Sequence, residues 1–244
     1  MLEPETGIPL FPLPERLPMA SQPTLPNRTL GGGHSRRSVN FGGLEIQYDE
    51  RVLSPRRWTV AQARWMADVL HRLPDGAVLE LCSGAGHIGL LTGAYTARDL
   101  VLVDASQAAC ELAELNLAAN PVAGSVEIRR GRIDEAIAPE ERFVGILADP
   151  PWVPSAQTSE FSDDPLTAID GGEDGLALAR VCLQVIDRHL APHGATILQL
   201  GTTAQADHLM DALESDDRAG PSLERVETRA FGDRGVLLHL ARRP

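Results

Sequence analysis

Residues 77 to 90 read AVLELCSGAGHIGL, a short apolar segment followed by a glycine-rich turn. The apolar part, AVLEL, is typical of a buried strand, and GHIGLLTGAY (86–95) predicts a helix. Gly84 and Gly86 allow the backbone to turn tightly and to approach a ligand. The first N–H groups of the helix point at the same place. A plain strand–helix turn is the alternative, and the spacing differs from the G-x-G-x-x-G of dinucleotide sites.

Strands and helices alternate along most of the chain. Besides the strand at 77–81, we expect strands at 100–105, 125–130, 143–148, 195–201, 224–231 and 235–241. We expect further helices at 58–73, 106–120, 176–190 and 204–214. This alternation predicts an α/β fold with a mostly parallel, seven-stranded sheet and helices on both faces.

The N-terminal part of the chain differs in composition from the rest. Residues 1–38 are rich in proline, which fixes φ and removes donors, so they predict an extended arm. Residues 39–58 contain a predicted β-hairpin, because Leu44 and Ile46 alternate with polar residues. Residues 59–244 are expected to form the main domain.

Composition limits what the chain can bind. The 34 acidic and 22 basic residues, the latter all arginine, give a net charge of −12. This charge disfavours broad nucleic-acid binding but leaves room for a local basic patch. The 3 cysteines suit a reducing cytoplasm, and neither they nor the 7 histidines show the spacing of metal ligands. No apolar run approaches the ~20 residues of a membrane span, so we expect a cytoplasmic protein without a metal.

Asp104 lies at the end of the second predicted strand of the sheet. In an open parallel sheet, ligands bind beyond the carboxyl ends of the strands. An acid there can accept hydrogen bonds from ribose hydroxyl groups. The alternative role is to cap the following helix. Considered with the glycine-rich turn, the ribose role is favoured.

These two strand ends resemble the class I S-adenosylmethionine-dependent methyltransferases. VLELCSGAGHIGL is similar to the glycine-rich motif of that fold, and VLVDAS to its second-strand motif. The resemblance implies a Rossmann-like methyltransferase domain at 59–244, with the hairpin segment on its substrate side and S-adenosyl-L-methionine as cofactor. The cofactor-binding residues that it implies are Glu80, Cys82, Ser83, Gly84, Gly86, Asp104, Ala105, Ile133, Asp134 and Asp149. Two positions depart from the family: Cys82 replaces the usual glycine, and Arg132 stands where an acid is usual.

The strand FVGILA ends in DPPW, residues 149 to 152. One interpretation is a turn, and the other is a clamp for a planar nitrogen during methylation. An amide or exocyclic amine carries two N–H donors, and Asp149 can accept one while the carbonyl of Pro150 accepts the other. The prolines hold that carbonyl rigidly, and Trp152 offers a flat face to the planar group. The position beside the predicted cofactor favours the clamp.

DPPW resembles the [N/D]-P-P-[Y/F/W] motif of methyltransferases that act on planar nitrogens. DDPLTAIDGGEDGLALARVCL (163–183) is similar to the segment that follows this motif in the protein glutamine N5-methyltransferases, which modify the Gly-Gly-Gln tip of release factors. VLSPRRWT (52–59) resembles the V-L-I-P-R-P-E-T of the same family. By itself GGEDGL is ordinary turn chemistry, but its register behind DPPW favours a structured wall of the site.

The resemblance covers about residues 39 to 210 and implies transfer of a methyl group to a glutamine amide of a protein, or to a small-molecule amide. The catalytic residues that it implies are Asp149, Pro150 and Trp152. The substrate-binding residues that it implies are Pro55, Arg56 and Pro151.

Several departures from the family keep two other functions open. The family usually has Asn at the place of Asp149 and Tyr at that of Trp152, and Asp there is usual in adenine-N6 methyltransferases. The loop after DPPW is short, and the proline-rich arm stands where the family has a helical domain that grips the release factor. The alternatives are an adenine-N6 methyltransferase on RNA or DNA and a non-catalytic, cofactor-binding partner protein. Cys82 and Arg132 favour the latter.

Overall fold

A seven-stranded sheet lies at the centre of the structure, a computed structural model that describes residues 35–120, 122–214 and 222–243. Its strand order is β5-β4-β3-β6-β7-β9-β8. Neighbours from β5 to β7 are parallel, whereas β9 is antiparallel to both β7 and β8. This confirms the mostly parallel sheet predicted from the sequence. The strands are β3 (Val78–Leu81), β4 (Leu100–Asp104), β5 (Val126–Arg130), β6 (Phe143–Ala148), β7 (Leu190–Leu200), β8 (Leu223–Ala230) and β9 (Val236–Arg242).

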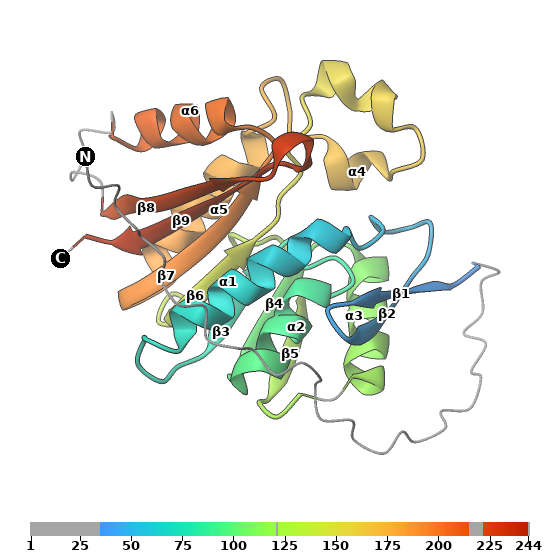
Figure 1. The fold of residues 1–244 in the computed structure, drawn as a ribbon, viewed down its shortest axis with the longest axis horizontal. Coiled ribbons are helices and arrows are strands. Elements are labelled where there is room, and N and C mark those ends of the chain that lie inside the picture. The colour runs from blue at the N-terminus through green and yellow to red at the C-terminus, as the bar shows by residue number, and fades with distance from the viewer. Residues whose placement is uncertain (1–34, 121, 215–221, 244) are drawn as a thin grey trace, which may run out of the picture.

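Helices cover both faces of this sheet (Figure 1). One face carries α1 (Val60–Leu70), α2 (His87–Thr96) and α3 (Gln107–Ala119), and the other carries α5 (Ala177–His189) and α6 (Thr203–Glu214). Successive residues of β3 alternate between the two cores: Val78 lies in the same apolar cluster as Met66 of α1, and Leu79 in that of Ile186 of α5. A strand buried on both faces is expected to read as an almost continuous apolar run.

The predicted hairpin is present and packs on α3. Its strands are β1 (Arg37–Phe41) and β2 (Leu44–Tyr48), paired antiparallel. The Asn116 side chain of α3 accepts from the N–H of Gln47 at 2.7 Å and donates to its carbonyl at 2.9 Å. β1 begins inside the segment assigned to the proline-rich arm, and residues 1–34 of that arm lie outside the described residues.

β7 differs from its prediction, because it begins at Leu190 rather than at residue 195. Its pairing with β6 jumps from Phe143 opposite Leu190 to Gly145 opposite Ala195. The residues between are irregular: position 192 is a proline, which cannot donate to a ladder, and His193 has a φ of 61°. The strand therefore begins before this irregularity, whereas the sequence predicted that it begins after it, at residue 195.

Short helices join several of the larger elements. They are η1 (Arg57–Thr59), η2 (Ser155–Phe161), α4 (Leu166–Ile169) and η3 (Gly232–Arg234). The part that contains η2 and α4 projects from the body at the upper right of Figure 1. Such single turns have no hydrophobic period long enough to predict. Within the described part of the chain, no helix has the length and apolar character needed to cross a bilayer.

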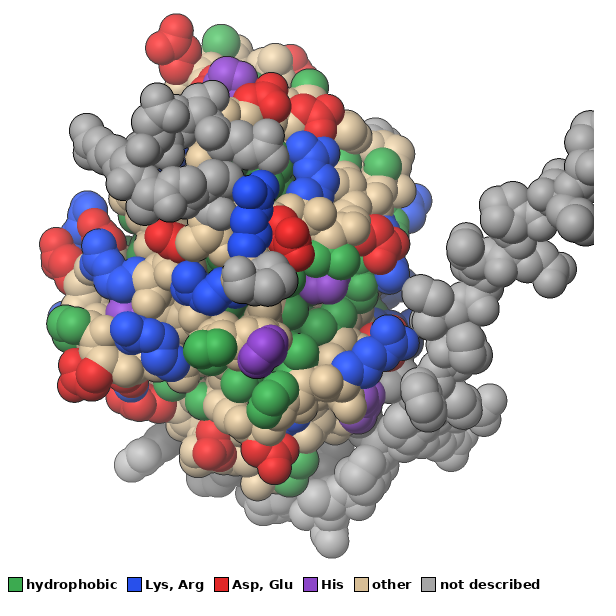
Figure 2. All heavy atoms as spheres, turned by 90° about the vertical axis from the view of Figure 1, so that its left-hand side faces the viewer, with side chains coloured by type: hydrophobic (Ala, Val, Ile, Leu, Met, Phe, Trp, Pro, Cys, Tyr) green, Lys and Arg blue, Asp and Glu red, His purple; other side chains and the backbone are tan. Residues whose placement is uncertain are grey.

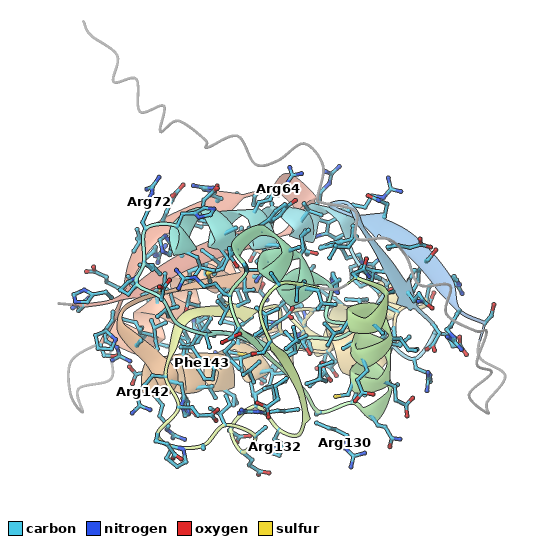
Figure 3. The ribbon with its side chains drawn as sticks, turned by 90° about the horizontal axis from the view of Figure 1, so that it is seen from below. Arg64, Arg72, Arg130, Arg132, Arg142 and Phe143 are labelled. Carbon is cyan, nitrogen blue, oxygen red and sulfur yellow. The ribbon has the colours of Figure 1, made fainter. Side chains whose placement is uncertain are left out.

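Gln62 of α1 forms hydrogen bonds to two neighbouring strands, β6 and β7. It is fully buried, and its Nε2 donates to the carbonyls of Ala148 and Ile197, both at 2.9 Å. Gln62→Met keeps the side-chain length but removes both bonds, so we expect the free energy of unfolding to fall by about 1–3 kcal/mol in urea titrations. Arg64→Met, at an exposed position of the same helix (Figure 3), is the control and should change it by less than ~0.5 kcal/mol.

Candidate active site

A cavity of about 770 Å³ opens at the carboxyl-terminal edge of the sheet. Small-molecule sites are typically about 300–1,000 Å³. The loops after four neighbouring strands (β3, β4, β5 and β6) contribute to its lining. Among the residues predicted from the sequence, it is lined by Cys82, Gly84, Asp104, Ala105, Ile133, Asp134, Asp149 and Pro151. The structure thus brings the predicted cofactor loops and part of the DPPW motif to one place.

The glycine-rich loop bends through three residues with positive φ: Cys82 at 58°, Gly84 at 52° and Gly86 at 75°. Cys82 therefore takes the left-handed conformation for which glycine is the usual residue. A Cβ atom at Gly84 would meet nothing within 4 Å, so open space lies directly above the backbone there. This shape fits a ligand that approaches the main chain closely, as the sequence predicted for the cofactor.

Glu80 supports the loop from behind. Its side chain is buried, and Oε2 accepts a hydrogen bond from the N–H of Gly89 in the first turn of α2 at 3.0 Å. Burial raises the pKa of Glu80 well above its ordinary value, and the nearby charges of Asp149 and Asp104 raise it further. Glu80, Ser83 and Gly86 are not among the residues that line the cavity, so their cofactor contacts stay predictions.

Asp104 joins the glycine-rich loop to the start of α3. Its Oδ2 accepts from the N–H of Gly84 and its Oδ1 from that of Ser106, both at 2.8 Å. Burial raises the pKa of Asp104, and these two hydrogen bonds oppose the rise. The residue that caps α3 is Ser106, whose side chain accepts from the N–H of Ala109 at 3.3 Å. The alternative role of Asp104 as the helix cap is therefore wrong.

The loop after β5 keeps an acid in the cavity despite the departure at Arg132. Asp134 and Ile133 both line the cavity, and Arg132 forms an ion pair with Asp134 at 2.8 Å. This bond lowers the pKa of Asp134. Arg132 itself is exposed and also lines the cavity; it is labelled in Figure 3.

Asp149 follows the last residue of β6 and lines the cavity. Burial raises its pKa to about 7, while the charge of Arg56 acts in the opposite direction. None of the described residues makes a hydrogen bond to this carboxyl group that would account for the shift. Asp149 is therefore an acceptor that is open to a ligand.

The rest of the DPPW motif is held by the GGEDGL segment and by Gln205. The carbonyl of Val153 accepts from the N–H of Gly171 at 2.8 Å, and the N–H of Val153 donates to the carbonyl of Ile169 at 3.0 Å, so Val153 forms a parallel bridge with Asp170. The Nε2 of Gln205 donates to the carbonyl of Trp152 at 2.8 Å and to that of Asp174 at 3.1 Å. The segment is thus structured, but residues 171–176 are not among those that line the cavity, so its role as a wall of the site stays a prediction.

The Trp152 ring lies against Gly201, where a Cβ atom would come within 2.3 Å of the ring. Neither Trp152 nor Pro150 is among the residues that line the cavity. Their roles as substrate platform and carbonyl acceptor stay predictions.

Pro55 and Arg56 lie beside the large cavity rather than in its lining. Arg56 forms an ion pair with Asp164, and its guanidinium lies 5.8 Å from the centre of the Trp58 ring. A smaller hollow of about 250 Å³ opens there, lined by Arg37, Tyr48, Asp49, Glu50, Val52, Ser54, Arg56, Asp163, Asp164 and Pro165. Val52 contributes to both hollows, so they are neighbours.

Several residues that line the cavity were not among the predicted site residues, although most of them lie within the quoted motifs. They are Arg51, Val52, Leu53, Ile88, Ser106, Ala109, Thr167, Ala168, Ala177, Leu178 and Val181. Arg51 is held by Asp49 at 2.7 Å and by Glu111 at 3.3 Å. His87, the first residue of α2, also lines the cavity. Burial lowers its pKa to about 4, so it is neutral near pH 7.

Comparison with known proteins agrees with this geometry. The family model described as "Methyltransferase small domain" matches residues 48–167. The release factor glutamine methyltransferase of Gloeobacter violaceus is 30% identical over 189 residues, 75% of this chain and 65% of the relative. The ribosomal protein uL3 glutamine methyltransferase of Bordetella pertussis is 29% identical over 209 residues, 80% of this chain and 65% of the relative. The chain thus spans slightly less than two-thirds of the length of these relatives.

Solved structures share the fold at lower identity. The catalytic domain of hMettl16 in complex with the MAT2A 3′UTR hairpin 1 superposes with a TM-score of 0.64 at 15% identity, covering 82% of this chain and 74% of that one. The ribosomal protein L11 methylase of Lactobacillus delbrueckii subsp. bulgaricus superposes with a TM-score of 0.58 at 15% identity, covering 79% of this chain and 82% of that one.

The fold and these matches define the class as that of the class I S-adenosylmethionine-dependent methyltransferases. Within it, the chain is similar to the release factor and uL3 glutamine methyltransferases, the resemblance that the sequence motifs indicated. S-adenosyl-L-methionine is accordingly its cofactor. Among the described residues, no cluster of His, Cys, Asp and Glu is suited to a metal ion.

Asp104→Ala should weaken the binding of S-adenosyl-L-methionine by about 1–3 kcal/mol, because a charged acceptor and the support of Gly84 are lost together. Isothermal titration calorimetry measures this as a rise in Kd of about fivefold to 150-fold. Asp99→Ala is the control: Asp99 also accepts two hydrogen bonds, from Ser125, but it lies at the opposite end of β4. An unchanged Kd for Asp104→Ala would remove this residue from the site.

Proposed function

We propose that the protein is an S-adenosylmethionine-dependent N-methyltransferase that acts on the side-chain amide of a glutamine in a protein. The observation that carries the proposal is the position of Asp149, which lines the same cavity as Cys82 and Gly84 of the glycine-rich loop. A methyl donor seated on that loop would lie beside an open hydrogen-bond acceptor. The names of the relatives in the two glutamine methyltransferase groups support the choice of amide.

The chemistry asks the protein to orient a weak nucleophile. When bound, S-adenosyl-L-methionine supplies a methyl group on a sulfonium. In the proposal, Asp149 and the carbonyl of Pro150 accept the two N–H groups of the amide and draw electron density onto its nitrogen. Trp152, held against Gly201, limits where the planar group can lie. Alignment of this kind can contribute several kcal/mol, up to about 7–11 kcal/mol for ideally placed reactants.

The charge around the site favours a protein substrate over a nucleic acid. The hollow next to the cavity presents four carboxylates, Asp49, Glu50, Asp163 and Asp164, against two arginines. Such a surface repels a phosphate backbone. Figure 2 shows the left-hand side of Figure 1, away from α4, and both arginine and acidic side chains occur on that face.

Specific features bear on the two alternatives. Asp149, where the family usually has Asn, favours an adenine-N6 methyltransferase, whereas the likeness to hMettl16 concerns the fold alone. A non-catalytic partner protein was suggested by Cys82 and Arg132. However, Cys82 adopts the torsion of the glycine that it replaces, and the loop of Arg132 still places Asp134 in the cavity. The proposal also locates the protein in the cytoplasm, since all three cysteines are unpaired.

The test is incubation with isotopically labelled cofactor and a panel of a release factor, ribosomal protein uL3, an RNA hairpin and a cell lysate. We expect label on a glutamine amide of a protein, located by mass spectrometry of peptides. Label on adenine, with binding that weakens steeply as salt rises, would support the adenine-N6 alternative. Cofactor binding without transfer to any member of the panel would support the non-catalytic alternative.

Asp149→Ala should abolish transfer while leaving the Kd for the cofactor within about twofold, because the residue acts on the nitrogen rather than on the donor. Calorimetry and the labelling assay measure the two quantities separately. A loss of cofactor affinity comparable to that of Asp104→Ala would contradict the role given to Asp149.

A further inference from the structure

The carboxyl group of Asp149 differs from those of the other acids around the cavity in its hydrogen-bond and ion-pair partners. Asp104 accepts two backbone N–H groups, Asp134 pairs with Arg132, and Glu80 accepts the N–H of Gly89. Asp149 has no such bond from the described residues. It is also the acid that stands where the related enzymes usually have an amide side chain. An amide can accept a hydrogen bond, but a carboxylate can also take the proton.

The cation whose charge acts on Asp149 is Arg56. Its charge lowers the pKa of Asp149, although burial is the larger effect and leaves the value at about 7. Arg56 is fixed by its ion pair with Asp164, in the segment that follows DPPW, and lies near the Trp58 ring. The ion pair and the ring contact restrain this guanidinium.

We propose that Asp149 takes the proton that the substrate nitrogen loses, and that Arg56, anchored by Asp164, is the positioning residue that keeps this carboxyl group ionised before transfer. The inference rests on the proposed methyl transfer. In the step, the nitrogen–carbon bond forms as the carbon–sulfur bond breaks, and sulfur keeps that electron pair and becomes a thioether. The N–H electron pair remains on nitrogen, and its proton goes to the Asp149 carboxylate, which later releases it to solvent. General bases of this kind typically contribute about 10²–10⁴-fold in rate.

The other titratable groups that face Asp149 do not change charge in the same range. Glu80 and Cys82 on the β3 side have pKa values raised well above their ordinary ones, mainly by burial for Glu80 and by the Cys182 contact and burial for Cys82. His87 of α2 has its pKa lowered to about 4 by burial. Farther around the cavity, Arg132 lowers the pKa of Asp134, which therefore stays ionised. Asp49 and Glu111 raise the pKa of Arg51, which therefore stays cationic. Asp104 has a raised pKa and therefore needs its own control.

The first experiment is the pH dependence of kcat with the glutamine substrate found in the labelling assay. For the wild type we expect the rate to rise with pH and to level off above a midpoint near the pKa of about 7, because the ionised carboxylate is the active form. Asp149→Asn keeps the hydrogen-bond acceptor but cannot take a proton. Its rate should be lower by about 10²-fold or more at pH 8 and should show no such midpoint.

Arg56→Gln tests the positioning role. Removing an opposite charge near a carboxylate typically raises its pKa by about one unit or more, so the midpoint should move to higher pH by that amount. Arg56→Lys should restore most of the shift. Arg51→Gln, which removes a cation that also lines the cavity, and Asp104→Asn are the matched controls and should leave the midpoint in place.

A second measurement, the pH dependence of unfolding, reports the ionisation of Asp149 without methyl transfer. Between about pH 5 and 6, Asp149 is ionised in the unfolded chain but protonated in the folded protein, so unfolding releases a proton and the wild type loses stability as pH rises. The unfolding equilibrium constant of the wild type, divided by that of Asp149→Asn, should therefore increase about tenfold per pH unit and become constant above the folded pKa. In Arg56→Gln the increase should extend to higher pH.

The outcomes separate the two proposals. Transfer to glutamine with a midpoint that survives in Asp149→Asn, or that Arg56→Gln does not move, overturns the proton role and leaves the proposed function standing. A ratio of unfolding constants that is flat from pH 5 to 6 overturns it as well. Failure of the wild type to methylate any substrate in the panel overturns both.

Discussion

The parallel pairing of β3 with β4 on one side and with β6 on the other is the constraint on which the site depends. Leu81 lies opposite Val103 and opposite Ala148, so three strands end at one level. The next residues along the chain are Cys82, Asp104 and Asp149. The bend at Cys82, the Asp104 carboxylate that supports the bend, and Asp149 are therefore brought together by strand pairing alone. A shift of one register position in either pair would separate them and would reverse which side chains face each core.

This arrangement gathers several acids at one edge of the sheet, and each is accommodated differently. Glu80 is buried and has a raised pKa, so the neutral form is favoured there. Asp104 uses backbone N–H groups, and Asp134 uses Arg132. Among these four acids, Asp149 has no hydrogen bond from the described residues, and only the charge of Arg56 and a ligand in the cavity can stabilise its ionised form. Perturbed acids in a cleft are characteristic of functional sites, and Glu80, Asp104 and Asp149 all have raised pKa values here.

Much of this could be predicted from the sequence, because the elements that build the site have strong local signals. The strand ends at Leu81, Asp104 and Ala148 follow from apolar runs that stop at glycine or acid. The sequence could not distinguish a helix cap from a ligand contact at Asp104, since both need an acid after a strand, and only the position of Ser106 decides it.

Other features depend on distant contacts. The early start of β7 follows from pairing with β6 across a proline, and the buried Gln62 bonds two strands that come 86 and 135 residues later. The cavity residues Arg51 and Leu53 come from a segment whose neighbours in space lie on other elements. Local patterns carry no information on such contacts, because tertiary packing sets them.

Gln205 has a consequence for how the chain can be divided. Its Oε1 accepts from the N–H groups of Gly201 and Thr202, at 3.0 and 3.1 Å, while its Nε2 holds the carbonyls of Trp152 and Asp174. One side chain on α6 thus joins the ends of two strands to the loop between them. In a chimera of two related enzymes, residues 149–205 should therefore come from the same parent. A junction placed inside this range would combine the DPPW motif of one enzyme with the residue at position 205 of the other.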